Sequence, residues 1–254
     1  SEGTIVTVMG RSDTQRSWGA EEDTMLDDIP MIVLVNQSSA SASEIVAGSL
    51  QANNRAVILG SRTFGKGSVQ QVLELASGGM LKFTTARYDL SNGRTIDKKL
   101  SKDTGLWGVD PNEGLVVRET LEERIERIKN REPFIVITEN EPEAYSCGDL
   151  AWIENTLVDR QLANALIAMR EHLTSGNWPV LSEDDPVLVG IQEEVTILAK
   201  RRVEILKTLF KVDGELTSLQ TELDEEDAST LPTDANLDEA SITLHDKDGN
   251  VIGT

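Results

Sequence analysis

The stretch from residue 36 to residue 71 constrains this chain most, and it reads NQSSASASEIVAGSLQANNRAVILGSRTFGKGSVQQ. A short apolar run at 31–35, MIVLV, comes directly before it and has the character of a buried strand in a parallel sheet. Residues 43–52 then carry apolar side chains at helical spacing, and 56–59 form a second short apolar run. A strand, a helix and a strand within about 30 residues are typical of a βαβ unit.

Further patterns surround this unit. A weakly alternating strand at 4–8 precedes a polar region at 10–30 that we interpret as a surface loop. The alternating runs 69–75 and 80–88 flank a glycine turn, which is a hairpin signal. Amphipathic patterns after residue 118 predict helices at 119–130, at 150–173 with a break near Asp159, and at 187–210 with a weaker continuation to 223. A short strand at 134–137, an acidic linker at 224–240 and a small hairpin at 242–252 complete the prediction.

The predicted fold is therefore α/β, with flanking helices and antiparallel hairpins around a sheet, followed by a mostly helical C-terminal region. Composition shifts predict boundaries that separate 1–118, 119–212 and an acidic linker and tail at 213–254. The chain starts with Ser1 at a strand, so we interpret it as a fragment or a processed form.

Composition excludes several classes of function. The formal net charge of −20 disfavours binding to nucleic acid and to anionic lipid. Cys147 is the only cysteine, which rules out an internal disulfide and a cysteine-based metal cluster. The two histidines, His172 and His245, lie in no motif of a Ser-His site.

Ser41 has two interpretations that are compatible with each other. Ser41 and Glu44 fit S-x-x-E, the capping box of a helix start. A serine at a helix N-terminus also lies beside free backbone N–H groups, which a developing oxyanion requires.

Lys66 also has several interpretations. Residues 60–66 match G-x-x-x-x-G-K, but Gly67 stands where a phosphate-binding loop needs Ser or Thr, and a strand follows instead of a helix. The alternatives are a solvated loop lysine and a general base, which would need burial to be neutral near pH 7. We expect Phe64 and the apolar run 56–59 to supply that burial. Gln70 either holds the lysine amine through a compact turn or faces outward from a strand.

These motifs together resemble the signature of the C-terminal processing peptidases, also called tail-specific proteases. That family has a strand, N-x-x-S-A-S-A-S-E-I, a helix, R-A-x-x-x-G and then T-F-G-K-G-x-V-Q, and every fixed element is present here. The similarity extends from about Gly3 to Val117, and it includes a T-x-A-R-Y strand ending at Tyr88 and a G-V-D-P turn at 108–111. It returns at 159–162, where D-R-Q-L is similar to the D-x-Q-L of the family.

The resemblance implies a serine endopeptidase with a Ser-Lys catalytic dyad and an acyl-enzyme intermediate. By motif, Ser41 is the nucleophile, Lys66 is the base, Gln70 supports the lysine, and the N–H of Ala42 forms half of the oxyanion hole. The other half comes from D-L-R-x-N-x-G-G in the family, and that motif is absent from this sequence. The family usually has a PDZ domain as well, which we expect upstream in the full-length protein.

The resemblance further implies a peptidase core similar to the ClpP/crotonase-like fold at 1–118. The expected substrates are proteins or peptides with apolar C-termini, cleaved near those termini. The expected location is extracytoplasmic, either periplasmic or membrane-associated, and no metal or other cofactor is required.

A rival interpretation belongs to a different functional class. In it, the peptidase-like module is inactive or incomplete and acts as a binding or assembly scaffold, with homo-oligomer formation through the helices from residue 187 onward. A nucleotide-binding protein, suggested only by the G-x-x-x-x-G-K match, is the third alternative.

Overall fold

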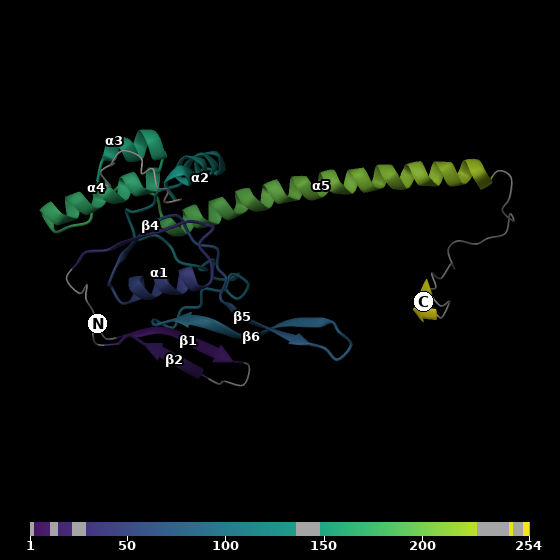
Figure 1. The fold of residues 1–254 in the computed structure, drawn as a ribbon, viewed down its shortest axis with the longest axis horizontal. Coiled ribbons are helices and arrows are strands. Elements are labelled where there is room, and N and C mark those ends of the chain that lie inside the picture. Colours follow the sequence, from purple (N-terminus) through teal and green to yellow (C-terminus); the bar gives the residue numbers. More distant parts are fainter. Residues whose placement is uncertain are drawn as a thin grey trace. The chain divides into compact units, whose positions relative to one another are not determined.

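The computed structural model describes residues 3–10, 15–21, 29–135, 148–227, 244–245 and 251–253. The chain forms two compact units, Ser1–Thr196 and Ile197–Thr254. The first unit is a mixed α/β structure (Figure 1). Its elements are β1 (Thr4–Gly10), β2 (Gln15–Gly19), β3 (Ile32–Val35), α1 (Ala42–Ala52), β4 (Val57–Gly60), β5 (Ser68–Glu74), β6 (Met80–Leu90), α2 (Leu121–Ile135), α3 (Leu150–Trp152), a π-helical turn (Ile153–Leu157), α4 (Arg160–Ser175) and the first turns of α5 (Pro186–Asp227).

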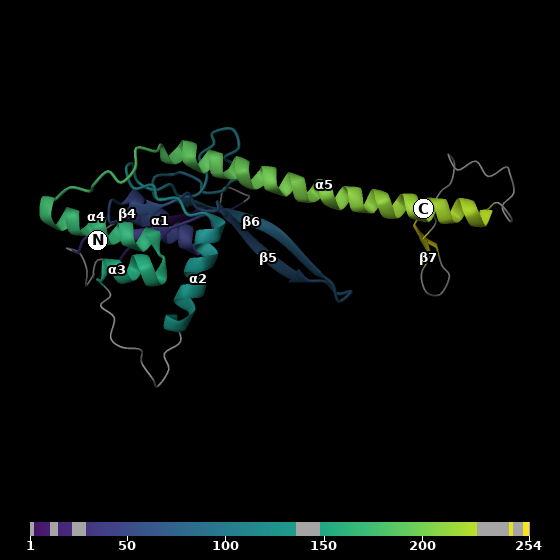
Figure 2. The same ribbon diagram turned by 90° about the horizontal axis from the view of Figure 1, so that it is seen from above.

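One layer of the first unit is a four-stranded antiparallel sheet in the order β2-β1-β6-β5. Strand β6 is long enough to pair with β1 near its end and with β5 along the rest, so the β5–β6 hairpin projects from the body (Figure 2). The predicted hairpin is thus confirmed. The interpretation of 10–30 as loop alone is wrong, because β2 lies within it. All residues of β2 are exposed, so no apolar alternation marks that strand in the sequence.

The predicted βαβ unit is confirmed. Strands β3 and β4 pair in parallel from Ile32–Val57 to Val35–Gly60, and α1 connects them. Helix α1 lies between this pair and the antiparallel sheet, as Figure 1 shows. Gly48 permits the close approach, since a Cβ there would come within 2.8 Å of the Leu90 side chain. The core at this junction comprises Val35, Ala47, Ile58, Leu90, Ile96 and Val109.

Helix α4 packs against the strands β3 and β4. Its Ala165 and Ala168 share a buried cluster with Leu59, Leu115 and Val117. The buried Gln161 donates to the carbonyls of Val35 and Val117 at 3.4 and 3.1 Å, so it ties the start of α4 to the end of β3.

The predicted break near Asp159 is confirmed. The π-helical turn ends at Val158, which has a left-handed φ of 54°, and Asp159 caps α4 by accepting from the Leu162 N–H at 2.9 Å. The short strand predicted at 134–137 is wrong at Phe134, which belongs to α2 and packs edge-on against Trp152 with 5.2 Å between ring centroids. Residues 136 and 137 lie outside the described residues.

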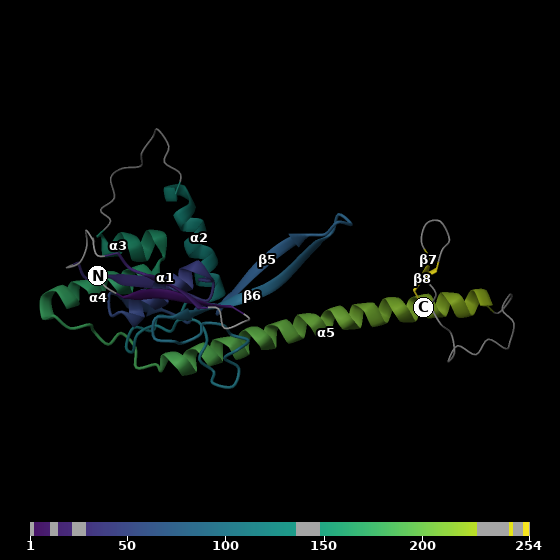
Figure 3. The ribbon, with the colours of Figure 1, turned by 90° about the horizontal axis from the view of Figure 1, so that it is seen from below.

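The second unit contains most of α5, which extends to Asp227, so the start of the predicted acidic linker is helical. The rest of that linker lies outside the described residues. Strands β7 (Leu244–His245) and β8 (Val251–Gly253) pair antiparallel, which confirms the predicted C-terminal hairpin (Figure 3). None of the helices described here combines the length and the apolar character that crossing a bilayer requires.

Candidate active site

Ser41 occupies a sharp turn between strand β3 and helix α1. It is the N-cap residue of α1, it is half-buried, and its backbone has φ 59° and ψ −116°. Residues other than glycine rarely adopt a positive φ, and such strained positions are concentrated at functional sites. A strained strand-to-helix turn is also the geometry that presents nucleophilic serines in hydrolases. The turn therefore distinguishes Ser41 from the other serines of the run.

The fully buried carboxylate of Glu44 joins this turn to the loop that carries Lys66. Its Oε2 accepts the backbone N–H groups of Ser41 and Lys66, each at 2.8 Å. Its Oε1 accepts the Thr63 hydroxyl at 2.5 Å and the Gly65 N–H at 2.6 Å. Because one oxygen binds both backbone nitrogens, Ser41 and Lys66 lie within two hydrogen-bond lengths of each other at the backbone.

The Lys66 loop connects β4 to β5 and follows the course that its glycines permit. Gly65 has a φ of 85°, and a Cβ at Gly67 would lie 2.6 Å from the Asp97 backbone nitrogen. A further tie to the serine run comes from the Phe64 N–H, which donates to the Ser39 carbonyl at 3.0 Å.

The prediction that neighbouring residues bury the Lys66 side chain is wrong. The Lys66 side chain is exposed, and the Phe64 side chain that was expected to cover it is 55% exposed. The run 56–59 cannot cover it either, because Ile58 and Leu59 fill the two buried clusters on either side of the β3–β4 pair. No hydrogen bond joins the Ser41 hydroxyl to the Lys66 amine among the described residues, so the connection between them runs through Glu44 and the backbone.

The two other candidate residues, Gln70 and Ala42, lie on strand β5 and helix α1. Gln70 is exposed on β5, at a register irregularity between Val69 and Gln70. Such a bulge redirects side chains and is common beside active sites. Ala42 is the first residue of α1, and its N–H has no acceptor in the described part of the chain.

Sequence reasoning missed two features of the site. It treated Glu44 only as a helix cap, and it gave no role to Thr63, whose Oγ1 also accepts the Val109 N–H at 2.7 Å. The E of S-A-S-A-S-E and the T of T-F-G-K-G were the available signals. Neither signal indicates that the two residues meet, because the contact forms only when β4 returns beside β3.

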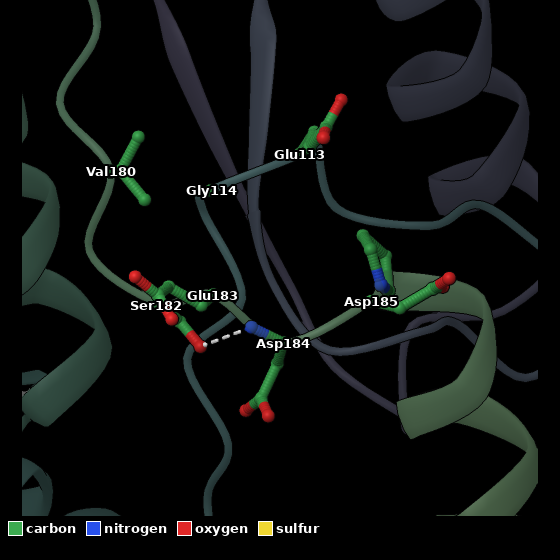
Figure 4. Close-up of a pocket in the computed structure, with 8 residues that line it drawn as sticks. Glu113, Gly114, Val180, Ser182, Glu183, Asp184 and Asp185 are labelled. Atoms are coloured by element: carbon green, nitrogen blue, oxygen red, sulfur yellow. Dashed lines mark hydrogen bonds between the residues drawn. The ribbon is translucent and has the colours of Figure 1, made fainter.

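A cavity elsewhere in the first unit contains none of these residues (Figure 4). It is lined by Glu113, Gly114, Val180, Ser182, Glu183, Asp184, Asp185 and Pro186. The Asp184 N–H donates to the Ser182 hydroxyl there at 3.0 Å. No group of acidic, histidine or cysteine side chains that could hold a metal ion is found in the ranges that the structure describes.

Comparison with known protein families matches the segment that contains Ser41 and Lys66. Peptidase family S41 matches residues 1–114. A carboxyl-terminal-processing protease of Synechocystis sp. is 45% identical over 97 residues, covering 38% of this chain and 22% of that protein. A carboxy-terminal-processing protease of Bartonella bacilliformis is 47% identical over 98 residues, with the same two shares.

The solved structure of a photosystem II D1 C-terminal processing protease is 33% identical to this chain. It matches with a TM-score of 0.41 over 46% of this chain and 28% of that protein. The chain spans 22% of the length of each of the two curated relatives above.

Proposed function

We propose that this chain is a member of peptidase family S41, whose model matches residues 1–114, and that Ser41 and Lys66 form the catalytic dyad of a serine endopeptidase. The observation that carries the proposal is the shared Glu44 carboxylate oxygen, which holds the strained Ser41 turn beside the Lys66 backbone. The same turn leaves the Ala42 N–H at a helix N-terminus, where it can stabilise an oxyanion.

In the proposed reaction, the neutral Lys66 amine takes the proton of the Ser41 hydroxyl while Ser41 Oγ attacks the peptide carbonyl carbon. The Ala42 N–H donates to the resulting oxyanion. Collapse of this intermediate passes the proton from Lys66 to the leaving amine and forms an ester on Ser41. Water, deprotonated by Lys66, then hydrolyses the ester and restores the free serine. Gln70 would orient the lysine amine during both the formation and the hydrolysis of the ester.

The exposed lysine amine needs desolvation before it can act as a base at neutral pH. We propose that bound substrate supplies it by covering the exposed Phe64 ring, which precedes Lys66 by two positions. On this proposal a bound substrate chain increases the reactivity of the base, which limits hydrolysis of other proteins.

The relatives named above are called carboxyl-terminal-processing proteases, and several others are named chloroplastic. We therefore propose cleavage near the apolar C-termini of protein substrates, in an extracytoplasmic compartment. A core of the ClpP/crotonase-like type and a PDZ domain upstream in the complete protein belong to the same proposal.

Serine substitutions in the complete enzyme test the nucleophile. Ser41→Ala should abolish peptide cleavage and labelling by a fluorophosphonate probe. Ser43→Ala, two positions along and exposed on α1, is the matched control and should retain both. Full activity of Ser41→Ala with loss of activity in Ser43→Ala would refute the assignment.

Lysine substitution tests the base. Lys66→Arg should be inactive although it keeps a positive charge, because a guanidinium does not give up its proton at any usable pH. An active Lys66→Arg enzyme would mean that Lys66 serves as a fixed charge and that another group is the base.

The exposure of Lys66 also favours one alternative, an inactive peptidase-like scaffold. The two functions predict different results with the same probe. A folded protein in which no serine reacts with fluorophosphonate, even with peptide substrate present, would favour the scaffold.

A further inference from the structure

Helix α5 is 42 residues long and carries a heptad pattern from residue 188 to residue 223. Every a and d position from 188 to 223 is apolar except Arg202. The a positions are Leu188, Val195, Arg202, Leu209, Leu216 and Leu223, and the d positions are Ile191, Leu198, Ile205, Val212 and Leu219. The apolar members are 36% to 60% exposed, so the stripe is largely open to water. A sustained a/d repeat of this kind is the pattern of a coiled-coil seam.

We propose that a second copy of this chain covers the stripe, with the two α5 helices pairing antiparallel about a two-fold axis near Lys207. In an antiparallel pair, a positions face d positions. An axis at residue 207 pairs residues that lie equally far before and after it, and this places each a position opposite a d position. Between residues 191 and 223 the resulting layers pair Val195 with Leu219, Leu198 with Leu216, Ile191 with Leu223, Ile205 with Leu209, and Arg202 with Val212. Four of these five layers are entirely apolar, and each occurs twice because a two-fold interface is self-complementary.

Arg202 is the residue that selects the direction. In a parallel, in-register pair each a residue faces its own copy, so two Arg202 side chains would meet in the seam. Like charges at that position are unfavourable in an environment that excludes water. The antiparallel pair separates the two arginines and places each opposite Val212, along which its aliphatic stem can lie.

The flanking positions also favour the antiparallel pair. Arg201 precedes one a position and Glu215 precedes another, and the axis at 207 brings these opposite charges side by side twice. Leu206, at an e position, faces its own copy across the axis. Glu194 and Glu222 also become neighbours, but the Glu194 carboxylate already has a counter-ion in Lys98 of its own chain. A parallel pair places none of these flanking charges opposite an ion of the other sign.

Sedimentation of the complete chain tests the association. We expect a dimer at micromolar concentration, and Leu209→Asp should convert it to a monomer by placing a charge in the central layers. Ser218→Asp adds the same charge at a c position outside the seam and should remain a dimer. A wild-type monomer at that concentration would overturn the proposal and leave the stripe to a different protein. Any assembly larger than a dimer would also overturn it.

Disulfide trapping tests the direction, because Cys147 is the only cysteine and can be removed as Cys147→Ser. In that background Leu206→Cys should cross-link to its own copy. Leu198→Cys should not, since its own copy would lie about 27 Å away along the helix at 1.5 Å per residue. Mixed Leu198→Cys and Leu216→Cys chains should form the heterodimeric disulfide. Self-cross-linking of Leu198→Cys without the mixed product would show a parallel pair and refute the inference.

Discussion

At the scale of single residues, the Glu44 carboxylate connects the two halves of the candidate site. Glu44→Gln replaces one accepting oxygen by an NH₂ group, which faces N–H donors and cannot accept from them. We expect fluorophosphonate labelling of Ser41 to slow by at least about tenfold, which corresponds to roughly 1.4 kcal/mol in the barrier. The rate should be measured at a temperature where the variant is fully folded.

The matched control for this substitution is Glu123→Gln. Glu123 has the same capping position in α2, where it accepts the Thr120 N–H at 2.7 Å, and it has no hydrogen bond to Ser41 or Lys66 in the described part of the chain. That variant should leave labelling unchanged. If Glu44→Gln lowers the melting temperature while the folded protein still reacts at the wild-type rate, the carboxylate has only a structural role.

Breaking the buried pair of Arg62 and Asp110 should cost more stability than breaking an exposed pair. Arg62 is 2% exposed, and its fork contacts Asp110 at 2.5 and 3.1 Å while its guanidinium stacks 4.4 Å from the Trp107 ring. Arg62→Met leaves a buried carboxylate without this partner, and we expect a loss of about 3–5 kcal/mol in the free energy of unfolding.

Urea denaturation measures this loss. The control is Lys207→Met, since Lys207 and Glu204 are 68% and 70% exposed at their side chains and their charged atoms are 2.9 Å apart. That exposed pair should contribute less than about 1 kcal/mol. Equal losses from the two substitutions would contradict the prediction.

At the scale of elements, the first turns of α5 pack against Arg62 at Gly190. A Cβ at Gly190 would lie 2.6 Å from Arg62 Nε, and Arg62 cannot move away easily because Asp110 holds it. Gly190→Ala should therefore cost about 1–3 kcal/mol of stability through overpacking.

Gly214 lies in the same helix and serves as the control, because the same substitution there should stabilise the protein. A Cβ there meets nothing within 4 Å, so Gly214→Ala should stabilise the helix by about 1 kcal/mol through helix propensity alone. Thermal unfolding followed by circular dichroism compares the two. If Gly190→Ala stabilises the protein, α5 does not pack closely against Arg62.

At the scale of the whole molecule, stability should depend on pH through Glu193. Burial raises the pKa of the Glu193 carboxyl above its ordinary value, although the charges of Arg118 and Arg62 oppose the shift. A carboxyl whose pKa is raised on folding binds its proton more tightly in the folded state. Its contribution to stability is present below the pKa of the unfolded chain and is lost as the pH rises through the folded value.

Glu193→Gln removes this effect while it preserves the size of the side chain. We expect the variant to unfold at a higher temperature than the wild type at pH 7, with the difference shrinking as the pH approaches 4. Glu204→Gln, on the exposed surface of α5, is the control for the same substitution in the same helix. A wild-type protein that is more stable than Glu193→Gln at pH 7 would mean that attraction to the arginines exceeds the cost of burial.

Local patterns in the sequence predicted much of this molecule. The βαβ unit, the β5–β6 hairpin, the break before α4 and the heptad of α5 follow from spacing of apolar residues, glycines and caps. These features involve residues close in sequence, and the periodicities of helix and strand are set by backbone geometry alone. The motif that contains Ser41 and Lys66 is likewise a local pattern, so the sequence indicated the candidate residues.

Only the tertiary structure decided how those residues meet. Glu44 bonds to Thr63, Gly65 and Lys66 because β4 pairs in parallel beside β3, and no local pattern in the sequence encodes that contact. The exposure of Lys66 was also decided by the tertiary structure. Ile58 and Leu59 are close to Lys66 in the sequence, but they pack into the core and therefore do not cover its side chain. Strand β2 depends entirely on its ladder with β1, because its own residues are polar or exposed. Contacts between distant segments form when the whole chain packs, and their free energy depends on neighbours that single-sequence patterns do not specify.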